Sequence, residues 1–339
     1  MLKESILENK SIPMILEYIG CHSIEFHQGN TDDFYTCANK NGDNQNAITV
    51  YCNTGLKCIN YTRELNPKKE SHDLIDLVMF NQEINFFHAI KLICDIVGVN
   101  YYKLENDNSD KPESIKILEL IDKMSADNDE YMDDVIVEPK PEHVLNYYKN
   151  MVNDLFYNDG ISYYTQQIFE IGYDDETDMI TIPIRDELGN LVGVKARTCN
   201  ETVIKNKYTY LIRCPRGKIL YNLFRSCESI IENGYVIVVE SEKACMQLFD
   251  MGIYNTVAIS GSKLTMAQKQ KLINLHVDIV FALDKDVEKE KIEDMANKFP
   301  LGYRIYALID EKGILKEKES PSDSAEKWKR MWQECMIQL

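Results

Sequence analysis

The stretch that decides the fold is GYVIVVESEKACMQLFDMGIYNTVAISGSKLT, residues 234–265. It begins with the β-branched run Tyr235–Val239, which is typical of a strand covered on both faces, and Glu240 follows this run directly. Ser241 is a residue type that caps helices, and Gly252 lies where a helix starting there would end. The letters TVAISG then predict a second strand that leaves the core in a Ser-Gly turn.

The residues that follow repeat this alternation. Thr265 can cap a helix that runs to Leu275, and VDIVFALD, residues 277–284, predicts a third buried strand. The order strand, helix, strand, helix, strand predicts a parallel, doubly wound sheet. In such sheets ligands bind beyond the carboxyl ends of the strands, so we expect the functional side chains at that edge.

Three acids fall at the predicted strand ends. Asp284 and Asp286 are one residue apart where the third strand ends, and strand alternation predicts that they project to the same side as a pair. Two adjacent carboxylates repel each other, and a divalent cation such as Mg²⁺ or Mn²⁺ is the simplest reason to keep both ionised. An isolated pair of this kind is also typical of a solvated turn, but here Glu240 is predicted at the same sheet edge.

This arrangement resembles the Toprim domain of primases, topoisomerases and some nucleases. In that pattern a glutamate follows one strand, Ser-Gly follows the next and Asp-x-Asp follows the third. The resemblance implies that Glu240, Asp284 and Asp286 bind Mg²⁺ or Mn²⁺ and carry out phosphodiester or nucleotidyl chemistry. Glu240 can be a metal ligand or a general base. The family pattern also implies a further acid after the next strand, which is Asp323 in SPSD, with Asp310 as the alternative.

The preceding segment, residues 143–232, resembles the basic half of a bacterial DnaG-type primase core. The matching features follow in family order: GIS, FEIGY, ITIPIRDELGNLVGVKAR, a KY pair and KILYNLF. The resemblance implies that a set of positions in this segment binds nucleic acid or nucleotides. These positions are Lys195, Arg197, Lys207, Tyr208 and Lys218.

The charge pattern agrees with that resemblance. The chain has a formal net charge of -17, which by itself argues against a nonspecific nucleic-acid binder. Between Lys195 and Lys218, however, seven basic residues stand against the single acid Glu201. Such a basic stripe with interleaved tyrosines can neutralise phosphates while its rings contact bases. The alternative is a solvated face held by salt bridges.

The N-terminal region resembles the zinc-ribbon domain that precedes the primase core, including the DLIDLV helix. The family uses two ligand pairs with two residues between the partners. Here Lys40 stands at the partner position of Cys37, and Tyr61 at that of Cys58, so one ligand of each pair is left as a remnant. Lysine and tyrosine are not ordinary zinc ligands. We therefore expect a degenerate ribbon that folds without zinc.

Two other residues bear on this expectation, because Cys52 or His72 could complete a zinc site with altered geometry. The predicted core of the small sheet needs no metal. It consists of Ile48, Val50, Tyr51 and Ile59.

The predicted fold class is a multidomain α+β and α/β protein, in which a Toprim-type parallel sheet joins a basic α+β subdomain and a small ribbon-like domain. No run of apolar residues approaches the roughly 20 needed to span a bilayer, and we expect a cytoplasmic protein without membrane contact. The chain contains no phosphate-binding motif of the helicase type. The predicted parts are the ribbon-like domain 1–102, an acidic linker 103–142, the basic half 143–232, and the Toprim domain with a C-terminal helix 233–339.

These features together predict a compact DNA primase that makes short RNA primers from nucleoside triphosphates on a single-stranded DNA template. The richness in Asn, Ile, Lys and Tyr indicates an AT-rich genome. The resemblance to compact primases, which phages and mobile elements often carry, implies such an element as the context, and a replicative helicase is a further candidate partner. Two alternatives stay open. One is a Toprim nuclease, which shares the acids but has no need of the KY and KILYNLF segments; the other is a catalytically silent DNA-binding accessory of replication.

Overall fold

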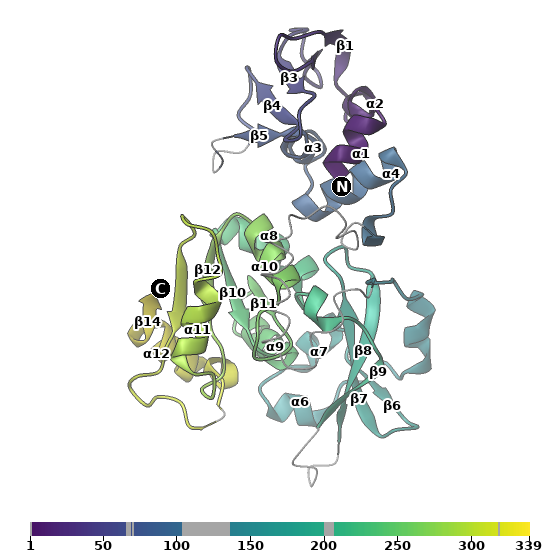
Figure 1. Ribbon diagram of the computed structural model, residues 1–339. Coiled ribbons are helices and arrows are strands. Elements are labelled where there is room, and N and C mark those ends of the chain that lie inside the picture. Colours follow the sequence, from purple (N-terminus) through teal and green to yellow (C-terminus); the bar gives the residue numbers. More distant parts are fainter. Residues whose placement is uncertain (1, 66–68, 70, 104–135, 200–206, 318) are drawn as a thin grey trace, which may run out of the picture. The chain divides into compact units, whose positions relative to one another are not determined.

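The computed structural model describes residues 2–65, 69, 71–103, 136–199, 207–317 and 319–339. The chain divides into two compact units, residues 1–119 and 120–339, with separate hydrophobic cores. The units contain three sheets with helices packed on them, so the expected mixed α+β and α/β multidomain class is confirmed (Figure 1). Most of the predicted acidic linker lies outside the described residues.

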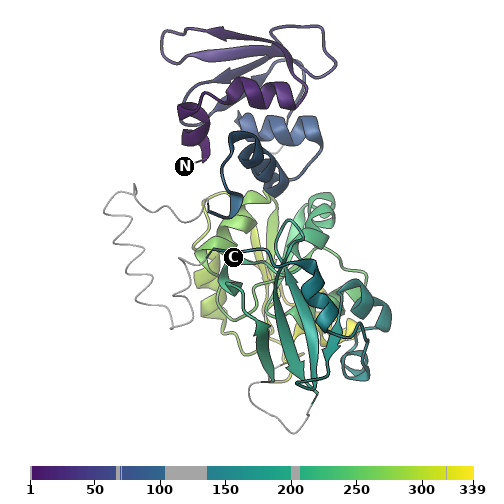
Figure 2. The ribbon, with the colours of Figure 1, turned by 90° about the vertical axis from the view of Figure 1, so that its right-hand side faces the viewer.

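The first unit is a five-stranded antiparallel sheet in the order β1-β2-β3-β4-β5, with its helices on one side of the sheet (Figure 2). The predicted DLIDLV helix is present as α3, and Asp73 begins it by accepting hydrogen bonds from the N–H groups of Ile75 and Asp76. The elements are α1 (Leu2–Glu8), α2 (Ile12–Tyr18), β1 (His22–His27), β2 (Phe34–Ala38), β3 (Ile48–Tyr51), β4 (Lys57–Asn60), β5 (His72–Asp73), α3 (Leu74–Gln82), α4 (Phe86–Val97) and the 3-10 turn η1 (Tyr101–Lys103).

Strand β3 is buried over the three consecutive residues Ile48, Thr49 and Val50. Ile48 and Val50 are fully buried against the helices, as expected, whereas Tyr51 and Ile59 are only half-buried. Cys37 and Cys58 lie in the same apolar core. This core therefore consists of aliphatic side chains and thiols.

The second unit begins with a four-stranded antiparallel sheet in the order β6-β7-β8-β9. Its central strands carry the predicted ITIPIRDELGNLVGVKAR hairpin, whose inner face packs Ile180, Ile182 and Val194 in the interior. The elements are η2 (Glu142–Tyr147), α6 (Asp154–Asn158), α7 (Tyr163–Ile168), β6 (Gly172–Asp174), β7 (Met179–Arg185), β8 (Leu191–Thr198), β9 (Tyr208–Ile212), η3 (Arg216–Lys218) and α8 (Leu223–Asn233).

The predicted parallel sheet is confirmed. Its order is β11-β10-β12-β13-β14, in which β10, β11, β12 and β13 run parallel and only β14 is antiparallel. Strand β14, which is three residues long, was not predicted. The elements are β10 (Tyr235–Val239), α9 (Glu242–Asp250), β11 (Thr256–Ala258), α10 (Met266–Asn274), β12 (Asp278–Phe281), α11 (Lys289–Ala296), β13 (Ile305–Leu308), η4 (Pro321–Asp323), α12 (Ala325–Glu334) and β14 (Met336–Gln338).

Local sequence signals explain where the helices of this sheet begin. Ser241 caps α9 by accepting from the N–H of Ala244, and Thr265 caps α10 by accepting from the N–H of Gln268, both as predicted. The Gln268 side chain in turn accepts from the Thr265 N–H, which completes a capping box. These caps fix the chain direction immediately after β10 and after the Ser-Gly turn.

One hydrophobic core joins the antiparallel and parallel sheets of the second unit, because Ile182 and Val192 belong to the same cluster as Ile237 and Val239. The segments 143–232 and 233–339 therefore share a single interior. Within the residues that the structure describes, no helix combines the length and apolar character needed to cross a membrane.

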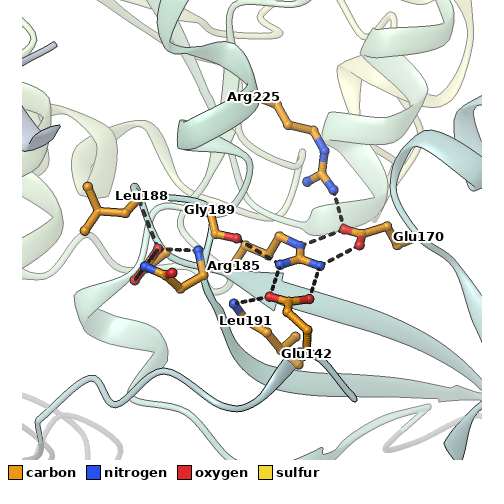
Figure 3. A network of polar contacts seen from close by, with 9 residues as sticks. Glu142, Glu170, Arg185, Leu188, Gly189, Leu191 and Arg225 are labelled. Carbon is orange, nitrogen blue, oxygen red and sulfur yellow. Dashed lines mark hydrogen bonds and ion pairs between the residues drawn. The ribbon is translucent and has the colours of Figure 1, made fainter. Parts of the chain in front are cut away.

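A network of ion pairs also ties the antiparallel sheet to the helices around it (Figure 3). Arg185, at the end of β7, donates to Glu142 at 2.8 and 2.9 Å and to Glu170 at 2.7 and 2.5 Å. Arg225 on α8 donates to the same Glu170 at 2.7 Å. Arg185 is only 9% exposed, so its two carboxylate partners compensate a nearly buried charge.

Candidate metal and nucleic-acid site

Three carboxylates meet at the carboxyl edge of the parallel sheet. Glu240 directly follows β10, and Asp284 and Asp286 follow its neighbour β12, which pairs with β10 in parallel register. One oxygen from each of Glu240, Asp284 and Asp286 lies within 4.8 Å of the others. The structure thus brings together the three acids that the sequence placed at strand ends.

The route by which the two aspartates meet differs from the expectation. Strand alternation was the predicted cause, but β12 ends at Phe281 and both aspartates lie in the turn beyond it. In that turn the Val287 N–H donates to the Asp284 carbonyl at 3.0 Å. The two aspartates converge as predicted, but a compact loop and not strand alternation brings them together.

Burial and mutual repulsion both act on these acids. Burial, followed by the charges of Asp284 and Asp286, raises the pKa of Glu240 to about 7. Burial is also the main cause that raises the pKa of Asp284, with smaller contributions from Asp286 and Asp323. Among the described residues, Glu240 Oε2 and Asp284 Oδ1 are buried oxygens without a hydrogen-bond donor.

A divalent cation would satisfy these groups. Mg²⁺ and Mn²⁺ prefer carboxylate oxygens, and a cation would supply the missing partner of both buried oxygens while compensating the repulsion. In the part of the chain that the structure describes, these three acids form the only group of at least three His, Cys, Asp or Glu side chains with this spacing. The donor set therefore fits a hard metal ion.

The two candidates for a distal acid differ sharply. Asp310 has a side chain that is 1% exposed, accepts from the N–H groups of Ile314 and Leu315 at 2.9 and 2.8 Å, and pairs with Lys285 at 3.0 Å. Burial alone would raise the pKa of Asp310, but these donors outweigh it and lower the pKa. Asp310 therefore has a structural role in holding its own loop.

Asp323 lies in η4, close to the three acids but outside their cluster. It accepts from the N–H of Ser320 at 2.9 Å and lies 3.4 Å from both Lys243 Nζ and Gln247 Nε2. The Ser320 side chain also lowers the pKa of Asp284. Ser320 therefore contacts Asp323 through its backbone and acts electrostatically on the acid cluster.

The basic stripe does not present all of its charges to solvent. Lys195 on β8 pairs with Glu242 at 2.6 Å, with side chains 14% and 2% exposed, and its ammonium lies 4.9 Å from the centroid of the Tyr208 ring. Glu242 also accepts from the Ser260 hydroxyl at 2.8 Å. This contact joins the antiparallel sheet to α9 and the Ser-Gly turn, next to Glu240.

The other predicted basic positions fall into three settings. Arg197 pairs with Asp159 at 2.8 Å, and Lys218 is only 5% exposed. Lys207 and Tyr208 are exposed at the start of β9. Arg213 and Arg216 of the stripe are exposed as well. Lys205 lies outside the described residues.

The zinc-ribbon remnants Cys37 and Cys58 are buried in the core of the first unit. Cys37 and Cys58 are 0% and 2% exposed. At their partner positions, Lys40 donates to the carbonyl of Asn81 at 3.4 Å, and Tyr61 is 64% exposed. Within the described residues no three thiol, imidazole or carboxylate groups around these thiols have ligand atoms that all lie within 4.8 Å of one another, so the side chains present do not have the spacing of a zinc site.

Sequence reasoning missed three polar residues of the site: Glu242, Lys243 and Ser320. Glu242 and Lys243 stand next to Glu240 in ESEK, where a charged pair at a helix start looks like an ordinary first turn. The partners of Glu242 and Lys243 lie 47 and 80 residues away, so no local pattern reveals them. Ser320 was visible only as part of SPSD.

The fold and the acid cluster define a class: a multidomain α/β protein with a site of metal-binding type at the carboxyl edge of a parallel sheet, beside a basic antiparallel sheet. No protein-family profile matches the chain. Its sequence is nevertheless similar to the DNA primases of several bacteria, and the chain resembles a DnaG-type primase.

Two sequence relatives and one solved structure are similar to this chain. The SPbeta prophage-derived uncharacterised protein YorJ of Bacillus subtilis is 32% identical over 213 residues, which cover 54% of this chain and 56% of YorJ. The DNA primase of Chlamydia muridarum is 32% identical over 118 residues, covering 33% of this chain and 19% of that primase. The crystal structure of the zinc-binding and RNA polymerase domains of Aquifex aeolicus primase has a TM-score of 0.47 at 17% identity, covering 100% of this chain and 86% of that one. The sequence matches thus span about half of YorJ and a fifth of the Chlamydia primase.

Proposed function

We propose that this protein is a DNA primase that joins nucleoside triphosphates into short RNA primers on single-stranded DNA. The observation that carries the proposal is the convergence of Glu240, Asp284 and Asp286 within 4.8 Å, in a chain whose sequence is similar to bacterial primases. We assign these acids to a Toprim domain. The similarity to a prophage protein supports a phage or mobile element as the context.

In this proposal each acid has a defined task. Glu240, Asp284 and Asp286 would hold Mg²⁺ or Mn²⁺, and such an ion lowers the pKa of an attacking hydroxyl and neutralises the charge of a departing pyrophosphate. Glu240 is alternatively the general base that accepts the proton of the attacking 3'-hydroxyl. Asp323 would hold the Ser320 backbone near the three acids.

The basic sheet would bind the template and the triphosphates. Lys207, Arg213 and Arg216 are exposed cations that can contact phosphates, and the Tyr208 ring can stack on a base. Lys195 and Arg197 are engaged within the protein by Glu242 and Asp159, so we assign them to holding the basic sheet in place. The Lys195 contact would keep the basic sheet fixed against the turn that carries Glu240.

The test is primer synthesis on single-stranded DNA with labelled nucleotides and Mg²⁺ or Mn²⁺. The wild-type chain should make short RNA products, and the double variant Asp284→Asn/Asp286→Asn should make none while remaining folded. Cleavage of the template without synthesis would replace the proposal by a Toprim nuclease. Template binding without either reaction would indicate a silent accessory.

A further inference from the structure

Lys243 is a cation at the acid edge that the sequence did not point to. It lies in the first turn of α9, and its Nζ is 3.4 Å from Asp323 Oδ1. The side chains of Lys243 and Asp323 are 28% and 25% exposed, so the pair is partly shielded from water. Partial burial makes such an ion pair stronger than one on an open surface.

The protein also holds Asp323 from two other directions. The Ser320 N–H donates to Oδ2 at 2.9 Å, and Gln247 Nε2 lies 3.4 Å from Oδ1. Gln247 is 2% exposed and is itself fixed, because it donates to the Asp159 carbonyl at 2.7 Å and accepts from the Ser322 hydroxyl at 2.9 Å. Both oxygens of Asp323 therefore already have donors from the protein.

The Lys243–Asp323 pair acts electrostatically on the three-acid cluster. The charge of Asp323 raises the pKa of Asp284, and the charge of Lys243 lowers it. The Ser320 N–H donates to Asp323, and the Ser320 side chain lowers the pKa of Asp284. Asp323 is thus the fourth carboxylate of this edge, and Lys243 is its counter-charge.

We propose that the ammonium group of Lys243 occupies the place that a second divalent cation would need beside Asp323, so that the site holds a single divalent cation when no nucleotide is bound. This inference rests on the metal-dependent function proposed above and specifies its metal stoichiometry. Lys243 is a positioning residue, because it acts through Asp323.

Charge balance explains why the lysine has this effect. One divalent cation reduces the charge of three ionised carboxylates from minus three to minus one, and Lys243 neutralises Asp323 separately. A second cation beside Asp323 would have to displace the ammonium group or lie next to a like charge. Replacing Lys243 by glutamine removes that obstacle and leaves Asp323 as an uncompensated carboxylate next to the cluster.

The experiment is a titration of the full chain with Mn²⁺ at pH 8 without nucleotide, in which electron paramagnetic resonance measures the free Mn²⁺. The wild type should bind one ion per chain, and Lys243→Gln should bind two. Lys243→Arg should remain at one, and Lys243→Gln/Asp323→Asn should return to one. A matched control is Lys289→Gln, which breaks the exposed Lys289–Glu311 pair of 3.0 Å and should leave the stoichiometry at one.

Two ions in the wild type, or one in Lys243→Gln, would overturn the inference while leaving the three-acid metal site intact. No bound ion in the wild type would overturn both the inference and the metal site of the proposed function. Primer synthesis is measured separately, so one bound ion in the wild type and two in Lys243→Gln, without primer synthesis, would refute only the primase proposal.

Discussion

The acid edge of the parallel sheet and the cysteines of the first unit are two places where the family resemblance implies a metal, and the structure treats them in opposite ways. At the acid edge, two buried carboxylate oxygens have no donor among the described residues, and the pKa of Glu240 rises to about 7. In the first unit, Cys37 and Cys58 pack as neutral thiols in an apolar core. A hydrogen bond with Cys21 and burial raise the pKa of Cys37, and burial raises that of Cys58.

The difference shows which group still requires a ligand. Ionised carboxylates that are buried together destabilise the fold until a cation compensates them. A buried thiol behaves as a small apolar side chain, and a raised pKa opposes the thiolate form that zinc binds. We therefore expect metal chemistry at the acid edge and metal-independent folding in the first unit.

The largest expected effect is on the acid edge itself. Asp284→Asn should reduce primer synthesis by a factor on the order of 10³ or more, because a bound cation contributes several kcal/mol to transition-state stabilisation. In the absence of metal the same variant should unfold no more easily than the wild type, since it removes a repelling charge. Asp294→Asn, the same change at an exposed position of α11, is the control. Strong destabilisation of metal-free Asp284→Asn would contradict the view that the buried carboxylates destabilise the fold until a cation compensates them.

The buried Lys195–Glu242 pair lies between the uncompensated acids and the neutral thiols, because a charge of the protein itself compensates the Glu242 carboxylate. Lys195→Met should lower the free energy of unfolding by about 3–5 kcal/mol, because it leaves Glu242 buried without its counter-charge. The double variant Lys195→Met/Glu242→Met should recover most of this loss in a urea titration. Lys207→Met, at an exposed position, should change stability by less than about 0.5 kcal/mol.

Primer synthesis by these variants separates two roles of Lys195. If the residue only holds the two sheets together, the double variant should be active as well as stable. A stable but inactive double variant would instead show that Lys195 contacts nucleotide or template, as the family resemblance implied.

The raised pKa of Glu240 predicts how metal affinity depends on pH. Below about pH 7 the metal-free protein carries a proton on Glu240, and a cation must displace that proton. Mn²⁺ affinity should therefore fall about tenfold per pH unit below 7 and level off above it. The same raised pKa affects folding, because the unfolded chain loses the Glu240 proton at lower pH than the folded protein does. Without metal, the free energy of unfolding therefore falls as pH rises from the ordinary carboxyl range towards 7. Glu240→Gln should flatten both dependences, and an unchanged slope in this variant would assign the proton to another group.

Much of this site followed from local sequence signals. The β-branched run before Glu240, the cap at Ser241 and the Asp-x-Asp after a buried strand predicted the sheet and its acid edge, because periodicity and caps are local properties. The partners of the charged residues were not predictable. Glu242 meets Lys195 across 47 residues, and Asp323 meets Lys243 across 80, so only the packed fold shows which charges are compensated. The basic stripe was visible as composition, but not its division into internal pairs and exposed cations.

The smallest expected effect concerns zinc, and it tests whether the first unit folds without metal. A zinc-selective chelator, added in the presence of Mg²⁺, should change the free energy of unfolding by less than about 0.5 kcal/mol, whereas a structural zinc contributes on the order of 10 kcal/mol. Elemental analysis of the purified chain should find no stoichiometric zinc, because Lys40 and Tyr61 stand where ligands are needed. Stoichiometric zinc together with a large loss of stability on chelation would mean that Cys37 and Cys58 leave the apolar core to bind metal. Cys52 and His72, the two half-buried residues that could complete such a site, would then be the first positions to replace.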